Sequence, residues 1–119
     1  MFGGIELGGT KCILAVAETP TNIISKKCIS TRNPENTFSE IHSFFSNFSV
    51  KKLGVGSFGP IVLDSESENF GIIIAESKAG WRDVNVVNYL MDICKDISID
   101  TDVNAAAIGE YNYGLENKY

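Results

Sequence analysis

One stretch near the amino terminus, GIELGGTK, carries residue types suited to binding an anion. It places Gly8 and Gly9 directly before Thr10 and Lys11. Glycines leave backbone N–H groups uncovered, and the hydroxyl and ammonium groups that follow could contact a phosphate at the same spot. A purely structural hairpin is the alternative. A two-residue Gly-Gly connection is typical of the tight primed turns, whose central residues have positive φ.

A second stretch, TDVNAAAIGE, carries a carboxylate where a strand is expected to run into a helix. Asp102 lies just before a helix that we expect to begin near Asn104 and to end at Gly114. The helix dipole and the free N–H groups of its first turn would stabilise the anion. Asp102 is therefore either an ordinary helix cap or a general base that accepts a proton from a substrate hydroxyl.

Composition narrows the class of protein. The chain has 119 residues, a formal net charge of −5 and 44% hydrophobic residues, which suits one domain with a sizeable core. No basic cluster exceeds the Lys51–Lys52 pair, which disfavours nucleic acid as a partner, and no apolar run is long enough to cross a membrane. Three widely spaced cysteines without a C-x-x-C pair disfavour a disulfide framework and a zinc site in this chain. We expect a cytoplasmic protein whose three thiols are small core residues.

The periodicity of apolar residues predicts the elements that position these groups. Strands are expected over 5–7, 12–17, 22–31, 53–56 and 97–103. One helix is expected after a capping box formed by Thr37 and Glu40, and a second after Asp83, with Val86, Leu90, Ile93 and Ile97 on one stripe. Short links make strands 1–3 antiparallel, and helical crossovers make strands 1, 4 and 5 parallel. The predicted fold is an α/β mixed five-stranded sheet flanked by helices, with ligands beyond the carboxyl ends of the parallel strands.

Four stretches in this order, GIELGGTK, GSFGP, KAGW and TDVNAAAIGE, resemble the N-terminal half of ROK-family sugar kinases. The resemblance extends from Met1 to about Gly114 and is strongest to the bacterial fructokinase-like branch. It implies the ribonuclease H-like fold shared by actin, hexokinase and Hsp70.

The same resemblance implies roles for individual residues. Gly8, Gly9, Thr10 and Lys11 would bind the β- and γ-phosphates of ATP. Glu6 stands where the family usually has an aspartate that helps to place Mg²⁺, often through water. Asp102 matches the catalytic base that would deprotonate a hexose hydroxyl, the 6-hydroxyl in related kinases. The sugar pocket would be lined by Ser57, Phe58, Gly59, Glu76, Thr101 and Asp102. Trp81 is expected to be a core or subdomain-closing aromatic residue near this pocket.

The implied function is that of a transferase in carbohydrate metabolism, which converts ATP and D-fructose to ADP and fructose 6-phosphate. Glucose, mannose and N-acetylhexosamines stay open as substrates, and so does a homodimer. Because kinases of this family have two lobes, we expect the chain to be the N-terminal lobe of a longer enzyme and to be nearly inactive alone. The second lobe would carry the family's zinc site. A non-catalytic sugar sensor or an actin-like interaction module is the alternative.

Overall fold

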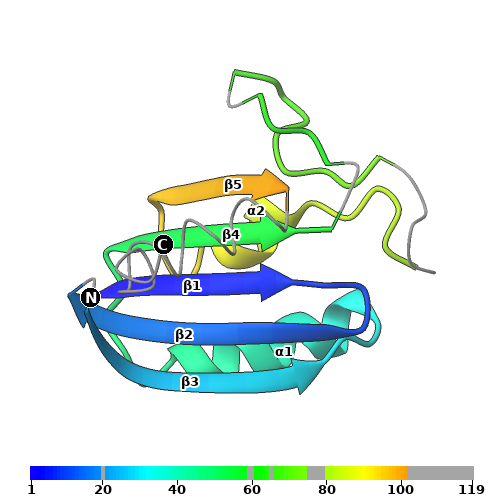
Figure 1. Cartoon of the computed structure of the whole chain (residues 1–119). Coiled ribbons are helices and arrows are strands. Elements are labelled where there is room, and N and C mark those ends of the chain that lie inside the picture. Colours follow the sequence, from blue (N-terminus) through cyan, green and yellow to red (C-terminus); the bar gives the residue numbers. More distant parts are fainter. Residues whose placement is uncertain (20, 59–60, 65, 75–79, 102–119) are drawn as a thin grey trace.

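A five-stranded sheet organises the computed structural model, which describes residues 1–101 except 20, 59–60, 65 and 75–79, with only the backbone at positions 100 and 101 (Figure 1). The elements in chain order are β1 (Phe2–Leu7), β2 (Lys11–Thr19), β3 (Asn22–Ser30), α1 (Pro34–Phe45), β4 (Lys52–Ser57), α2 (Val86–Leu90) and β5 (Ile97–Thr101). The strand order is β3-β2-β1-β4-β5. β2 is antiparallel to β1 and β3, whereas β1, β4 and β5 are parallel, so the predicted sheet is confirmed.

The parallel strands end in register. Leu7 pairs with Ser57 across the β1–β4 ladder, and Ser57 pairs with Thr101 across the β4–β5 ladder. Paired residues lie side by side across a sheet, so the three carboxyl ends form one row. The loop that follows β1 and the segment that follows β4 therefore start next to each other.

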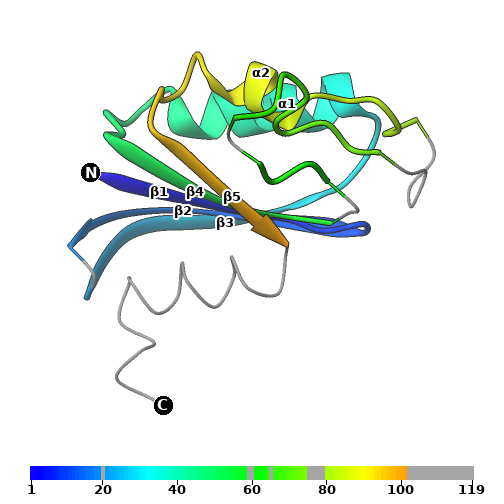
Figure 2. The ribbon, with the colours of Figure 1, turned by 90° about the horizontal axis from the view of Figure 1, so that it is seen from above.

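Both helices cover the same face of the sheet (Figure 2). Along β1, Ile5 and Leu7 are buried and Glu6 is half-buried, which is the alternation expected of a strand with one face on a core. The core between sheet and helices includes Leu14, Phe38, Ile41, Phe45, Leu53, Val55, Trp81 and Leu90. Glu6 consequently belongs to the face that α1 and α2 leave free.

The predicted cap of α1 is wrong. Asn33 is the N-cap, and its side chain accepts a hydrogen bond from the N–H of Asn36 at 2.8 Å. Pro34 follows at the first helical position, where its missing N–H is not needed. Thr37 lies inside the helix, fully buried, and its hydroxyl accepts from the N–H of Arg32 at 2.8 Å. Thr37 cannot be the cap, because it lies one turn inside the helix that Asn33 starts, with its hydroxyl on the Arg32 N–H.

The second helix is also shorter than predicted. α2 is capped by Asn85, whose side chain accepts from the N–H of Asn88, and it ends after five residues. Asp83 has a φ of 67° and its N–H donates to the carbonyl of Ile73, so it belongs to the preceding loop. Ile97 is the first residue of β5 instead of the last position of a helical stripe.

The expectation that all three thiols lie in the core holds for Cys12 and Cys94 but is wrong for Cys28, which is exposed. Cys28 lies on the edge strand β3, where it pairs with Ile13 of β2. Its neighbour on β3, Ile29, faces the core. The alternation along a strand therefore directs Cys28 to the free face. The third predicted helix, 104–114, lies outside the described residues.

Candidate functional site

The glycine hairpin connects β1 to β2 through Gly8, Gly9 and Thr10, with the Gly8 N–H donating to the Lys11 carbonyl at 3.1 Å. Neither glycine has positive φ, so the primed two-residue turn predicted for them is wrong. The connection has one residue more than that turn. Carbonyl groups of the loop are also bound from outside it, so its shape is not set by the local turn alone.

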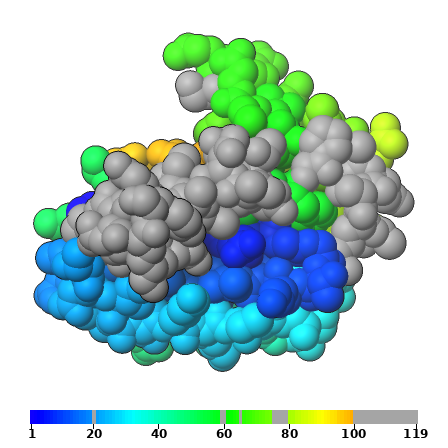
Figure 3. All heavy atoms as spheres, viewed as in Figure 1, coloured from blue at the N-terminus to red at the C-terminus, as the bar shows by residue number. Residues whose placement is uncertain are grey.

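The two glycines differ in what surrounds them. A Cβ at Gly8 would lie 2.7 Å from the Lys11 carbonyl oxygen, whereas a Cβ at Gly9 would meet no atom within 4 Å. Gly8 is therefore needed by the fold, but the chain gives no packing reason for a glycine at position 9. The space beside Gly9 is open to a ligand. The space-filling view shows the blue atoms of the β1–β2 segment at the molecular surface (Figure 3).

Thr31, just past the end of β3, binds the hairpin from the side. Its hydroxyl donates to the Gly8 carbonyl at 2.7 Å, and its N–H donates to the Thr10 carbonyl at 2.9 Å. The residue is buried, with 7% of its surface exposed. No role for Thr31 follows from the sequence, because a threonine that ends a strand has no distinguishing pattern. Only the tertiary pairing of β3 with β2 brings it to the hairpin.

Glu6 and Lys11 lie on the same free face of the sheet. Glu6 pairs with Ile13 on β2 and with Gly56 on β4, and Lys11 is two residues before Ile13 on the same strand. Within the described part of the chain the one ion pair joins Arg32 to Glu40, so Lys11 forms none there. A cation and a carboxylate thus flank the hairpin, and Gly56 adds no side chain between β1 and β4.

These residues fit the Mg²⁺ that accompanies a nucleotide. Such an ion is usually held by one or two carboxylates together with phosphate oxygens and water. Glu6 supplies one half-buried carboxylate at the end of β1, close in sequence to the hairpin. Among the residues that the structure describes, no three His, Cys, Asp or Glu side chains form a cluster that could hold a metal without further ligands.

The segment after β4 is held against the core. The Phe58 N–H donates to the Leu7 carbonyl at 2.8 Å, and the Phe58 ring packs edge-on against Trp81 with centroids 5.4 Å apart. The buried Ser57 hydroxyl donates to the Phe58 carbonyl at 2.8 Å. Trp81 is fully buried and its indole N–H donates to the Arg32 carbonyl at 2.9 Å. The expectation that Trp81 is a core residue is thereby met.

The structure brings some of the predicted site residues together. Glu6, the hairpin, Ser57, Phe58 and the backbone of Thr101 lie at the carboxyl ends of β1, β4 and β5. Gly59, Glu76 and Asp102 lie outside the described residues, as does the side chain of Thr101. Asp102 directly follows Thr101 in the chain, so a described strand leads to it.

Burial raises the pKa of the Cys12 thiol above its ordinary value. The Sγ atom lies 3.2 Å from the Thr31 hydroxyl oxygen. Because the Thr31 hydroxyl hydrogen is directed at Gly8, the thiol is the donor in this contact. Cys12 therefore stays protonated, and it contacts the hairpin through Thr31.

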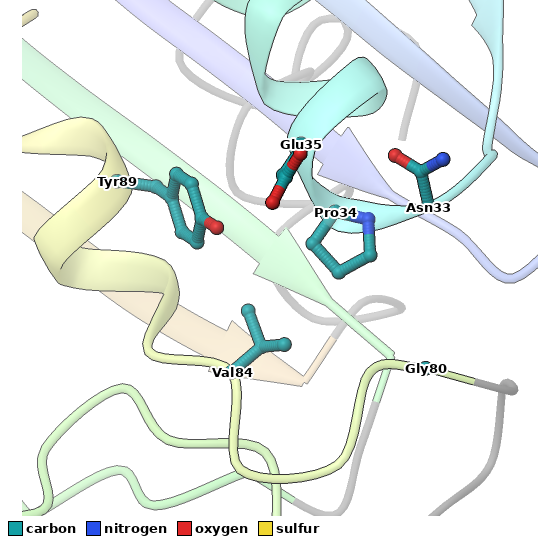
Figure 4. A pocket seen from close by; sticks show the side chains of 6 residues that line it. All are labelled: Asn33, Pro34, Glu35, Gly80, Val84 and Tyr89. Carbon is teal, nitrogen blue, oxygen red and sulfur yellow. The ribbon is translucent and has the colours of Figure 1, made fainter.

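A separate hollow of about 450 Å³ lies at the start of α1 (Figure 4). It is lined by Asn33, Pro34, Glu35, Gly80, Val84 and Tyr89. None of these is a predicted site residue.

Among the described residues no helix is long and apolar enough to cross a membrane.

The chain matches one protein family and is similar to several fructokinases. The family described as ROK family matches residues 2–119. A fructokinase of Lactococcus lactis subsp. cremoris is 43% identical over 119 residues, covering 98% of this chain and 41% of the relative. A fructokinase of Streptococcus mutans serotype c is 36% identical over 116 residues, covering 92% of this chain and 39% of the relative.

A solved structure has the same fold. It is a ROK family glucokinase from Streptomyces griseus in complex with glucose and AMPPNP, with a TM-score of 0.71 and 24% identity, covering 95% of this chain and 36% of that one. The chain thus spans about two fifths of the length of the relatives that it matches.

Proposed function

We propose that this chain, which belongs to the ROK family, forms the N-terminal lobe of an ATP-dependent hexose kinase. The observation that carries the proposal is the row of strand ends, where the open glycine hairpin after β1 lies beside the ends of β4 and β5. The enzyme would transfer the γ-phosphoryl group of ATP to a hexose. The 43% identity to a fructokinase supports D-fructose as the substrate and the 6-hydroxyl as the acceptor.

The hairpin would bind the phosphates of ATP. Gly9 leaves its surroundings open, and its N–H forms no backbone hydrogen bond among the described residues. Lys11, two residues after Gly9, is exposed and carries a positive charge that can pair with a phosphate. Phosphoryl transfer through a loose transition state depends on positioning and charge neutralisation, which backbone N–H groups and one lysine supply well.

Glu6 would hold Mg²⁺ together with the phosphate oxygens of ATP, directly or through water. When bound, the ion would neutralise charge on the phosphates. The longer side chain of Glu6 reaches further from β1 than an aspartate would.

Asp102 would take the proton from the hexose hydroxyl as that oxygen attacks the γ-phosphorus. Its place in the sequence, one residue beyond the end of β5, supports this role, because Thr101 lies in the same row as Leu7 and Ser57. Gly59, Glu76 and Thr101, with Ser57 and Phe58, would form the sugar pocket. The packing of Phe58 on Trp81 would give this pocket a rigid wall.

A second lobe would supply the remaining adenosine, phosphate and sugar contacts. We place the enzyme in the cytoplasm, where the three free thiols among the described residues would stay reduced.

Substitution of the proposed base tests the function. In the protein expressed from its native, uninterrupted reading frame, Asp102→Asn should lower kcat by roughly 10² to 10⁴-fold, the usual contribution of a general base. The KM for ATP should stay within about twofold of the wild-type value, because the carboxylate contacts the sugar instead of the nucleotide. ADP production over a panel of hexoses measures both parameters.

Asp96→Asn is the matched control, since Asp96 is an exposed acid just before the same strand. A wild-type protein that gives no ADP with any hexose, or an Asp102→Asn variant that retains its kcat, would contradict the proposal.

A further inference from the structure

The junction between β3 and α1 contacts both loops of the proposed site. Thr31 donates two hydrogen bonds to carbonyl groups of the hairpin, from its hydroxyl to Gly8 and from its N–H to Thr10. The next residue, Arg32, accepts the indole N–H of Trp81, on which Phe58 packs. One short segment therefore connects the proposed phosphate loop to the wall of the proposed sugar pocket.

The two bonds from Thr31 fix the direction of two peptide groups. In a trans peptide the C=O and the following N–H point in opposite directions. Because the Gly8 and Thr10 carbonyls point at Thr31, the N–H groups of Gly9 and Lys11 point away from it. The same two bonds thus decide where the loop directs its donors.

A third contact fixes the Thr31 hydroxyl itself. The Cys12 thiol, 3.2 Å away and buried, donates to the hydroxyl oxygen, and the hydroxyl donates to Gly8. The hydroxyl thus accepts from the thiol and donates to the Gly8 carbonyl, so it has a single favoured orientation. Burial, which raises the pKa of Cys12, keeps the thiol in the donor form.

We propose that Thr31 is a positioning residue for nucleotide binding, which holds the 8–11 hairpin in the shape that directs its N–H groups at the phosphates of ATP. This inference rests on the proposed function of the hairpin. Thr31 lies 23 positions after Gly8 in the sequence, and its side chain need not contact ATP. Its effect should therefore appear in the KM for ATP more than in the KM for the hexose.

The test compares three variants of the protein expressed from its native reading frame. Thr31→Val keeps the branched shape and removes the hydroxyl, and Thr31→Ser keeps the hydroxyl. Thr37→Val is the matched control, because Thr37 is a buried threonine whose hydroxyl also binds a backbone group but does not touch the hairpin.

Thr31→Val should raise the KM for ATP about tenfold, the size expected from one lost hydrogen bond. The KM for the hexose should stay within about twofold, and Thr31→Ser should restore most of the ATP affinity. Thr37→Val should lower the melting temperature without changing the ratio of the two KM values. Equal KM ratios in Thr31→Val and Thr37→Val would overturn the inference.

Amide hydrogen exchange separates this inference from the proposed function. The Gly8 N–H, which donates to the Lys11 carbonyl, should exchange several-fold faster in Thr31→Val than in Thr37→Val. Unchanged exchange there would overturn the role of Thr31 even if the enzyme is a kinase. Faster exchange in a protein that turns over no hexose would support the role of Thr31 in holding the hairpin and reject the kinase assignment.

Discussion

At the scale of single residues, Gly8 and Gly9 look alike in the sequence but differ in the structure. A side chain at position 8 would collide with the Lys11 carbonyl, whereas position 9 is open. Neither glycine needs positive φ. Gly8 therefore serves the closure of the hairpin, and the reason for Gly9 has to be sought in what binds there.

This difference gives a paired prediction. Gly8→Ala should lower the free energy of unfolding by about 1–3 kcal/mol, because the new methyl group forces the hairpin apart. Gly9→Ala should change it by less than about 0.5 kcal/mol, as is usual for an exposed position. In the full-length protein, however, Gly9→Ala should raise the KM for ATP roughly tenfold, because its methyl group occupies the space that the phosphate needs.

Denaturant unfolding and the KM for ATP measure the two effects, and each variant is the other's control. A Gly9→Ala protein with unchanged ATP affinity would mean that the hairpin is structural and that the anion-binding interpretation of GGTK is wrong.

At the scale of elements, α1 holds the β3–α1 junction in place. Its cap, Asn33, follows two residues after Thr31, and its buried residues Phe38, Ile41 and Phe45 pack on the sheet. Phe38 also stacks on Tyr89 of α2, with ring centroids 4.3 Å apart. Packing of this one helix therefore supports the segment that contacts the hairpin.

Asn33→Ala should lower the free energy of unfolding by about 1 kcal/mol, because the Asn36 N–H loses its acceptor. Asn36→Ala should have little effect, since Asn36 is exposed and only its backbone takes part in the cap. Chemical denaturation of the two variants measures the difference. Equal stabilities would show that Thr37, as the sequence suggested, or another residue provides the cap.

The sequence predicts the sheet well because strand identity and connection length are local properties. Alternating apolar residues mark β1, β2 and β4, and the length of each link decides whether neighbouring strands are antiparallel or parallel. The caps are predicted less well. Thr37 and Asp83 have suitable side chains, but α1 begins earlier, at Asn33 and Pro34, and Asp83 adopts a loop conformation with positive φ.

Some parts of the candidate site can be predicted from the sequence and others cannot. The hairpin and the ends of β4 and β5 are found from the sequence, because the order of strands alone brings them together. Thr31 and Cys12 could not be found, since nothing in their neighbourhood distinguishes a threonine at a strand end or a buried cysteine. Their role depends on the register that pairs Cys12 with Ile29 and so brings Thr31 beside Gly8.

At the scale of the whole molecule, the chain forms one five-stranded sheet with a core on one face. The residues that we propose to bind ligands lie in a row at one end of this sheet. It spans about two fifths of its relatives' length. We therefore expect the isolated chain to fold around this sheet but to turn over ATP far more slowly than the full-length protein, because half of the proposed ATP site would be missing.

The product of the reaction distinguishes a hexose kinase from a protein that does not phosphorylate sugars. The full-length protein, incubated with ATP, Mg²⁺ and D-fructose, should form ADP and fructose 6-phosphate in equal amounts, as measured by ³¹P NMR. The 119-residue chain at the same concentration is the control and should form neither at a comparable rate. Formation of ADP without a sugar phosphate, or of no ADP with fructose or any other hexose, would contradict the assignment of this site to hexose phosphorylation.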